Sequence, residues 1–481
     1  MQKHFTDSPS PPPEAPGEPS LGPDEKRDIV KRFSKHLNRG QIRYLRAGHL
    51  DILESRRKAL GFTEPESGRF MFDCFTSAGC FNVGRSNPIV RRALEEALST
   101  CDMGSCHLLS EAKIRFAKTL VEKAPGDLTH LFFAAGGGEA IDCALKLALG
   151  ATGRPEVIST IKAYHGHTGL ALSVNGKEHY RKYFEPLMPN VHVAPFNDLD
   201  AIKRAASTKT AAIIIEPVQG EAGIHVAEAG YVQGLRTLCD GLGIFLIFDE
   251  VQTGFGRTGK LFAAEHYGVS PDILATAKSI GGGLFPNGAV LYKMSRDVER
   301  FLDDWPAFHL SYSGGSDIGC HVSLAVLEEI DRLSLCDNAL ERGAQFRQAL
   351  VEIQAENPGI IREIRGIGLM VGIEYIHEFM GPMMSNALAE GGVFAAYSGN
   401  APQVMRFMLP LTVSREEIDL VVDVIRQAIR TMKTLLPIAL PAAKIPGVLT
   451  LLNNEKIQTV TFNWLRNLES VGQFITQGRR R

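Results

Sequence analysis

Two side chains of opposite charge follow apolar segments of this chain and suit covalent catalysis. Asp249 lies near the end of the apolar run that begins at Ile244, and Lys278 stands shortly before three glycines, Gly281 to Gly283. A lysine amine can attack a cofactor aldehyde, and an anionic aspartate keeps a pyridine nitrogen protonated. The pair therefore suits a pyridoxal phosphate site. Taken singly, a strand-end acid and a solvated lysine explain the same two residues.

A glycine cluster further upstream has the properties of an anion site. The apolar segment that starts at Phe132 breaks into three glycines and continues as an amphipathic helix opened by Glu139. Amide groups at a helix start point outward unpaired, and the helix dipole favours an anion. A packed helix face is indicated by Ile141, Ala144, Leu145, Ala148 and Leu149. We predict phosphate contacts at Gly137 and Gly138, the alternative being a flexible turn.

The elements that must position these residues alternate in an α/β pattern. From about residue 104 to 294, β-branched apolar runs alternate with helical patterns, and two of these runs are residues 211–217 and 244–250. Apolar strands that end in acids are typical of parallel strands buried on both faces, and open α/β sheets bind ligands at these ends. After Ser334, a helix, a strand pair and a last helix predict a smaller α+β unit.

Composition excludes several classes of partner. The chain has 481 residues, 44% hydrophobic and 22% charged, with a net charge of −2, and its Lys and Arg residues are scattered. This pattern predicts no nucleic acid or membrane partner, and no apolar run reaches the ~18 residues of a membrane span. Eight cysteines without a C-x-x-C pair or a signal peptide indicate reduced thiols, a cytoplasmic protein and no metal site.

Taken together, these residues resemble the class III aminotransferases, the ornithine and GABA aminotransferase group of fold-type I pyridoxal-phosphate enzymes. The resemblance covers roughly residues 70–432. It depends on the segment FDEVQTGFGRTG at residues 248–259, on Pro271 to Ile273, and on Lys278 with its glycine-rich tail. It implies an α/β fold with a large domain, whose mostly parallel seven-stranded sheet has helices on both faces. A small α+β domain would be built from the N- and C-terminal parts.

The domain limits expected from composition and resemblance divide the chain into five parts. The Pro-rich start predicts a disordered tail. The parts are a tail at 1–30, the N-terminal part of the small domain at 31–103, the large domain at 104–334, the C-terminal part of the small domain at 335–435, and an unassigned extension at 436–481.

The resemblance implies roles for single residues around pyridoxal 5'-phosphate. Lys278 would form the Schiff base and then act as general base in proton transfer. Asp249 would pair with the pyridine nitrogen and Gln252 would contact the phenolic oxygen. Tyr164 would stack on the ring with His165 beside it, and Gly137 and Gly138 would bind the phosphate.

The resemblance also implies a switch at the substrate end. In the family, the glutamate at the position of Glu221 can pair with the arginine at the position of Arg406. The arginine is released to hold a substrate carboxylate in a bidentate fork. One pocket would then accept an amine donor in one half-reaction and a 2-oxo acid in the other. The alternative is a permanent salt bridge.

Three positions depart from the family pattern. Gly136 replaces a serine of the phosphate loop, and Tyr312 replaces the threonine that reaches the phosphate across the dimer interface. Tyr312, Ser311 or Ser313 would substitute for it. Arg85 stands where many relatives have histidine, and it is either a cation near the site mouth that favours an acidic donor or a solvated arginine.

The function implied is that of a class III transaminase that moves an amino group from an amine or amino acid to a 2-oxo acid by a ping-pong mechanism. It would work as a homodimer, or a dimer of dimers, with the site at the interface. The same core motifs would serve a lyase that expels ammonia or phosphate from an amino-alcohol phosphate or aminophosphonate, or an aminomutase. A non-catalytic binding protein does not fit the complete set of cofactor residues.

Overall fold

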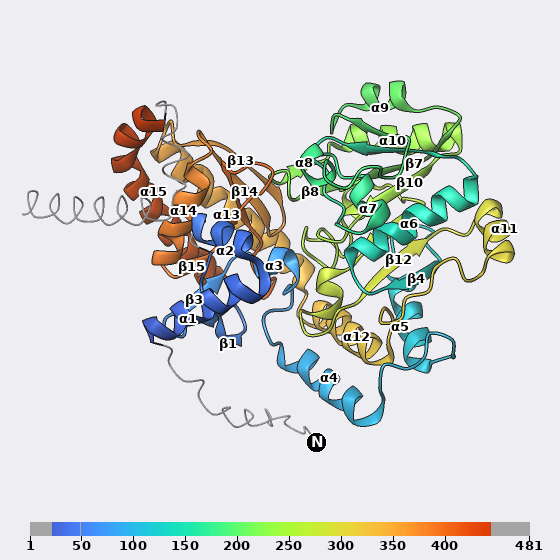
Figure 1. Ribbon diagram of the computed structural model, residues 1–481, viewed down its shortest axis with the longest axis horizontal. Coiled ribbons are helices and arrows are strands. Elements are labelled where there is room, and N and C mark those ends of the chain that lie inside the picture. Colours follow the sequence, from blue (N-terminus) through green and yellow to red (C-terminus); the bar gives the residue numbers. More distant parts are fainter. Residues whose placement is uncertain (1–21, 49, 444–481) are drawn as a thin grey trace, which may run out of the picture.

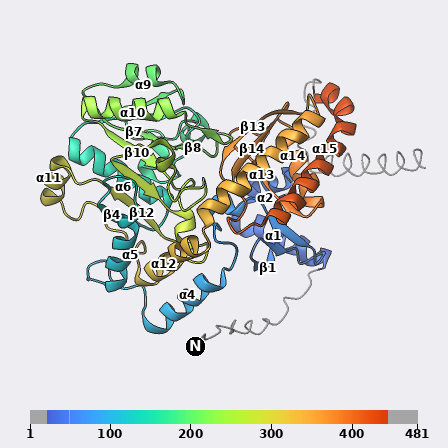
Figure 2. The same ribbon diagram turned by 180° about the vertical axis from the view of Figure 1, so that it is seen from behind.

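The protein is described by a computed structural model that covers residues 22–48 and 50–443. Two lobes are visible in Figure 1. The larger lobe holds the central part of the sequence, and the smaller lobe places the N-terminal helices (blue) beside the C-terminal ones (orange to red). The view from behind in Figure 2 shows the same grouping.

A seven-stranded sheet forms the centre of the larger lobe, in the order β4-β12-β11-β10-β7-β5-β6. All of its strands run in parallel except β12, which pairs antiparallel with β11 and β4. The predicted mostly parallel sheet is confirmed. Its strands are β4 (His130–Ala134), β5 (Glu156–Thr160), β6 (Val191–Ala194), β7 (Thr210–Ile215), β10 (Phe245–Asp249), β11 (Ile273–Thr276) and β12 (Gly288–Tyr292).

Helices cover both faces of this sheet. Ile214 and Ile247 pack on one face, and Ile213 and Leu246 pack on the other, because successive side chains of a strand point to opposite sides. Burial on both sides explains the continuous apolar runs of the sequence. One face is covered by α6 (Gly137–Thr152), α7 (Gly169–Ser173) and α11 (Arg296–Asp304), and the other by α9 (Leu199–Ala205) and α10 (Ala229–Leu242).

The smaller lobe joins the two ends of the described chain. Strand β3 pairs in parallel with β15, so one four-stranded sheet combines N-terminal and C-terminal segments. The strands of its two sheets are β1 (Ser55–Lys58), β2 (Gly61–Thr63), β3 (Phe70–Asp73) and β15 (Val393–Phe394), then β13 (Ile361–Ile367), β14 (Met370–Tyr375), β17 (Val404–Phe407) and β16 (Ala396–Tyr397). The predicted small α+β unit built from both parts of the chain is confirmed.

The remaining elements surround these sheets. In the smaller lobe they are α1 (Pro23–Phe33), the π-helical turn η1 (Ser34–Asn38), α2 (Arg39–Ala47), α13 (Leu335–Glu356), α14 (Met380–Glu390) and α15 (Arg415–Ala443). Between and below the lobes lie the left-handed turn α3 (Thr76–Gly79), α4 (Pro88–Thr100), α5 (Glu111–Glu122) and α12 (Asp317–Arg332). Short elements near the strand ends are α8 (Glu178–Arg181), β8 (Val218–Gln219), β9 (His225–Val226), η2 (Ala263–Tyr267) and η3 (Lys278–Gly281).

Both ends of the described chain differ from the predicted limits. Helix α1 begins at Pro23, inside the predicted tail, because a proline at the first helical position, acids in the first turn and bases in the last turn all favour a helix. Helix α15 continues to Ala443, beyond the predicted limit at 435. The rest of the tail, 1–21, and of the extension, 444–481, lies outside the described residues. Within the described part, no helix has the length and apolarity to cross a membrane, and no metal-binding cluster is present.

Candidate active site

One cavity of about 580 Å³ opens at the carboxyl ends of the parallel strands β4, β5, β7, β10 and β11. Most of the residues predicted from the sequence meet here. Those that line the cavity are Gly137, Gly138, Tyr164, His165, Glu221, Asp249, Gln252 and Lys278. The structure thus places residues spread over 142 positions in one space, as expected for ligands at the strand ends of an open α/β sheet.

Lys278 enters the cavity from the end of β11, next to the parallel strand β10 that ends in Asp249. Its φ of 49° is left-handed, which costs energy for a side chain other than glycine and is common at functional sites. Burial lowers the pKa of Lys278, although Cys80, Asp249 and other acidic groups oppose this shift. A lowered pKa increases the neutral fraction of the amine, which is the form that acts as nucleophile.

Two donors hold the carboxylate of Asp249. Its Oδ1 accepts the Val251 amide at 3.0 Å, and its Oδ2 lies 2.7 Å from Nδ1 of His165. Both side chains are almost fully buried. Among the described residues, Nε2 of His165 is buried without a partner, so the hydrogen bond of its ring is the one to Asp249, while its backbone amide donates to Oδ1 of Asn175 at 2.6 Å. The ring therefore holds that carboxylate in one orientation.

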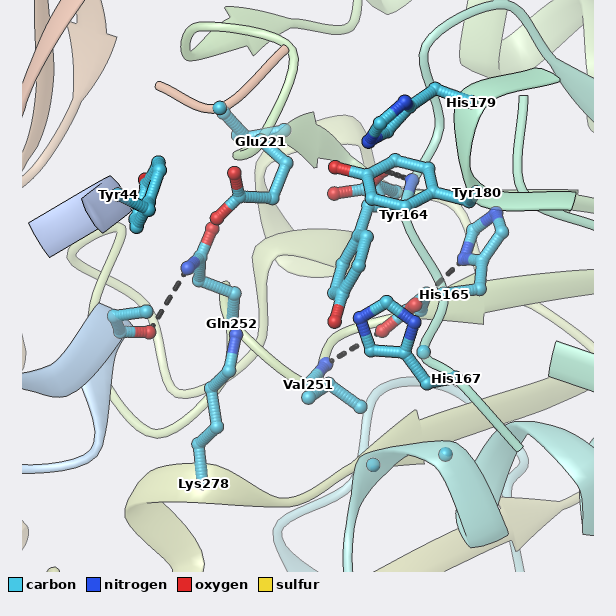
Figure 3. A pocket seen from close by; sticks show the side chains of 18 residues that line it. Tyr44, Tyr164, His165, His167, His179, Tyr180, Glu221, Val251, Gln252 and Lys278 are labelled. Carbon is cyan, nitrogen blue, oxygen red and sulfur yellow. Dashed lines mark hydrogen bonds and ion pairs between the residues drawn. The ribbon is translucent and has the colours of Figure 1, made fainter. Parts of the chain in front are cut away.

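Aromatic side chains surround Tyr164 in the cavity. Its ring centroid lies 5.4 Å from that of His167 and 5.5 Å from that of Tyr180, and Figure 3 shows the three rings together. Gln252 lies on the other side of the cavity, near Lys278. Its Nε2 donates to the Ala78 carbonyl at 3.0 Å, which fixes the amide group.

The glycine cluster forms the start of helix α6. The cap residue Gly136 offers no side-chain hydrogen bond, so the first amide groups of the helix have no acceptor inside it. Gly137 and Gly138 of this turn line the cavity. A Cβ atom at Gly138 would meet Oγ1 of Thr168 at 2.8 Å, and one at Gly137 would meet Cγ1 of Val251 at 2.8 Å. The absence of side chains therefore lets the helix start approach the cavity wall.

These groups fit pyridoxal 5'-phosphate. The cavity offers an amine for an aldehyde, a buried carboxylate for a pyridine nitrogen, an aromatic ring for its face and helix amides for a phosphate. All four come from the carboxyl ends of strands of the same sheet, β4, β5, β10 and β11.

The predicted ion pair at the substrate end is present. Nη1 of Arg406, on β17, lies 2.5 Å from Oε1 of Glu221, and the guanidinium also stacks over Phe75 at 5.1 Å. Glu221 lines the cavity and Arg406 does not. The arginine side chain is only 4% exposed, and Glu221 is 22% exposed. The carboxylate therefore stands between the arginine and the cavity.

Three predicted positions lie elsewhere. Tyr312 is 85% exposed, and neither it nor Ser313 lines this cavity. Both expectations for Arg85 are wrong, because it is neither at the mouth nor solvated. Its guanidinium is buried between the carboxylates of Asp73 at 2.6 Å and Glu54 at 2.7 Å, over the ring of Phe81.

Several lining residues were not predicted from the sequence, namely Tyr44, His167, His179 and Tyr180, and Glu216 was expected only as an acid at a strand end without a role of its own. His167 lies two residues after His165, and Glu216 ends the apolar run of β7, so both carried a local signal. Tyr44 belongs to α2 in the other lobe and reaches the cavity only through tertiary packing.

Comparisons of the sequence and of the structure with known proteins both find aminotransferases. The family model for class III aminotransferases matches residues 48–429. An uncharacterized aminotransferase of Archaeoglobus fulgidus is 38% identical over 394 residues, which are 82% of this chain and 92% of the relative. An ornithine aminotransferase of Toxoplasma gondii, solved with partial occupancy of PLP, has a TM-score of 0.79 at 26% identity, covering 85% of this chain and 95% of its own. An (S)-enantioselective omega-transaminase of Thermomicrobium roseum has a TM-score of 0.76 at 28% identity, with coverages of 84% and 98%.

Proposed function

The chain belongs to the class III aminotransferase family, and from this premise we propose which of its residues carry the reaction. The protein is a fold-type I, pyridoxal-phosphate-dependent aminotransferase that moves an amino group from an amine or amino acid to a 2-oxo acid. The observation that carries the assignment of residues is the convergence of Lys278, Asp249, Gln252 and Tyr164 on one cavity at the strand ends.

The residues divide the work among them. Bound pyridoxal phosphate supplies an aldehyde for the substrate amine and an electron sink for the carbon next to it. Lys278 would hold the aldehyde carbon, Asp249 the protonated pyridine nitrogen and Gln252 the phenolic oxygen. The helix amides at Gly137 and Gly138 would hold the phosphate. Once the substrate amine has displaced it, Lys278 takes up and returns a proton at Nζ.

The ion pair of Glu221 and Arg406 would sort the two substrates. While the pair is closed, Glu221 compensates the charge of Arg406 at the cavity wall. The closed site then suits a donor whose reacting amine has no carboxylate beside it. When Glu221 turns away, Arg406 presents a bidentate fork to the carboxylate of the 2-oxo acid.

Single-turnover chemistry tests the function. The holoenzyme, incubated with an amine donor and no 2-oxo acid, should transfer one amino group per site and then stop. Sustained release of ammonia would instead establish a lyase.

A lysine variant tests the assignment of residues. Lys278→Ala should bind the cofactor weakly and lose the visible absorbance of the holoenzyme, and its rate should fall about 10²–10⁴-fold or more, because the general base is removed. Retention of that absorbance would identify a different lysine.

A second copy of the chain would complete the site. Apolar side chains are exposed on the segments 103–114 and 305–317, at Leu108, Leu109, Ile114, Leu310 and Tyr312. The two segments touch, since Ser110 Oγ donates to Asp317 Oδ1 at 2.6 Å, and Gly314 packs against Ala134 near the glycine cluster. This apolar face therefore adjoins the phosphate end of the cavity. An isologous homodimer, in which Tyr312 and Ser313 serve the partner's site, fits this arrangement.

We also propose a cytoplasmic location. It is supported by the eight cysteines, all of which are free thiols in the described chain.

A further inference from the structure

A buried carboxyl group of the cavity, that of Glu216, has no role in the mechanism above. It follows strand β7 directly and is 7% exposed. Each of its two oxygens accepts a backbone amide from a different loop. Oε1 accepts the amide of Tyr164 at 3.0 Å, and Oε2 accepts the amide of Gly220 at 3.1 Å.

The two loops carry groups that face the cofactor and the substrate. Tyr164 lines the cavity and is the residue expected to stack on the cofactor ring. Gly220 precedes Glu221, and it packs so closely on Gln252 that a Cβ atom there would lie 1.6 Å from Oε1 of that side chain. One carboxylate thus links the ring-stacking residue to the turn that carries the arginine partner.

We propose that Glu216 is a positioning residue of the transamination site, whose ionised carboxylate clamps the Tyr164 loop and the Glu221 turn together. The proposal rests on the proposed function, because it concerns the placement of residues assigned there.

The clamp requires both oxygens to be acceptors. A protonated carboxyl keeps one full acceptor, its carbonyl oxygen, while its hydroxyl oxygen becomes a donor with little remaining acceptor capacity. The bond to one of the two loops is then weakened. Hydrogen bonds to a charged acceptor are also stronger than those to a neutral one.

The surroundings place this change near neutral pH. Burial raises the pKa of Glu216 to about 7, opposed by His165 and supported by Asp249. The other titratable groups that interact with it are Lys278, at the end of β11, and Tyr164, on one of the clamped loops. Glu221, on the other clamped loop, lines the same cavity. As the pH falls through about 7, the carboxylate takes up a proton and its hold on one of the two loops weakens.

Hydrogen exchange of the holoenzyme, read by mass spectrometry and corrected for intrinsic rates, tests the clamp. In the wild type, exchange at Tyr164 and Gly220 should rise as the pH falls through about 7. In Glu216→Gln, exchange at one or both of these amides should be about tenfold faster at pH 8, which is the factor expected for the loss of one charge-assisted hydrogen bond. The dependence of this exchange on pH should vanish in the variant. The KM for the amine donor should lose its inflection near pH 7 in this variant.

Glu250 provides a matched control. It is fully buried, and burial raises its pKa to about 7 as well. It accepts two backbone amides, from Ala263 at 2.7 Å and Ala264 at 2.8 Å, but it does not line the cavity. Glu250→Gln should loosen residues 263–264 and leave Tyr164 and Gly220 protected.

If both loops of Glu216→Gln exchange at the wild-type rate, the proposal is overturned. It is also overturned if exchange in the wild-type protein shows no step near pH 7, a result that requires no variant. Exchange does not depend on turnover. A protein that fails the single-turnover test but shows the clamp would therefore refute the function and not the clamp.

Discussion

At the scale of single residues, the buried charge of Arg406 depends on its partner. A buried guanidinium is costly unless it is paired, and here the pairing group is itself a wall of the cavity. We therefore expect the carboxylate that pairs with Arg406, whether from Glu221 or from the substrate, to decide what the site accepts.

Removal of that carboxylate should shift the preference between substrates. In Glu221→Gln the charge of Arg406 is uncompensated, so the KM for the 2-oxo acid should fall and the KM for an amine without a carboxylate should rise. Each change should be about fivefold to tenfold, on the order of 1 kcal/mol. Steady-state kinetics with both substrates measures the ratio. Glu341→Gln, which breaks a surface pair with Arg342, serves as control, and an unchanged ratio in Glu221→Gln would establish a permanent salt bridge.

Single residues were predictable where their neighbours in sequence carried the signal. Asp249, Gln252 and Lys278 could be predicted because their separations along the sequence match the family pattern. The structure brings these residues together in one cavity. Arg85 was interpreted wrongly because the carboxylates of Asp73 and Glu54 meet it only through folding. Tyr44 was missed because it comes from the other lobe.

At the scale of elements, the start of helix α6 determines how closely backbone amides approach the cavity. Gly138→Ala would place its Cβ atom 2.8 Å from Oγ1 of Thr168, so one of the two must move. We expect the dissociation constant of the cofactor to rise about tenfold, from an overpacking cost of about 1–3 kcal/mol. Absorbance titration of the apoenzyme with the cofactor measures it.

The chain offers two controls for this variant. Gly136→Ala should change little, because its φ of 177° is extended and no heavy atom lies within 4 Å of its Cβ position. Adding Thr168→Ala to Gly138→Ala should restore the affinity for the cofactor, because it removes the Oγ1 atom that the new Cβ atom would meet. Thr168 makes no capping hydrogen bond to α7, so its replacement should not disturb that helix. Equal affinity of Gly138→Ala and wild type would show that close approach at Gly138 is not needed.

Elements buried on both faces were the predictable ones. Continuous apolar runs in the sequence predict strands β7 and β10, and the helical period of apolar residues predicts α6. The two-residue strands β15 and β16 and the left-handed turn α3 have no such pattern, because the pairing partner or the surrounding packing imposes them.

At the scale of the whole molecule, the apolar face on segments 103–114 and 305–317 should determine assembly. Leu109 is 99% exposed. Leu109→Asp places a charge in the proposed interface, so the protein should sediment as a monomer and bind its cofactor more weakly, because the partner's residues are lost. Leu420→Asp on α15, at a leucine that is 56% exposed, should leave assembly unchanged. A dimer that survives in Leu109→Asp would place the interface elsewhere.

Buried acids should also shape the stability of the molecule with pH. Glu250 has a folded pKa of about 7, and an unfolded glutamate has one of about 4.3. Between these values the folded chain holds a proton that the unfolded chain has released, so stability falls as the pH rises. Its contribution to the loss from pH 4 to 7 is on the order of 3 kcal/mol. The midpoint temperature of thermal unfolding should fall less steeply between pH 4 and 7 in Glu250→Gln than in the wild type. Equal slopes for the two proteins would contradict the assignment.

The pairing of β3 with β15 has a consequence for folding during synthesis on the ribosome. Arg69, next to β3, bonds to the carbonyl of Glu390, 321 positions later, just before β15. A ribosome adds roughly 5–20 residues per second, so the first strands are synthesised on the order of tens of seconds before their partner. During this time their edge is open to other chains. The larger lobe can be assembled first, and the smaller lobe closes only after β15 has been synthesised.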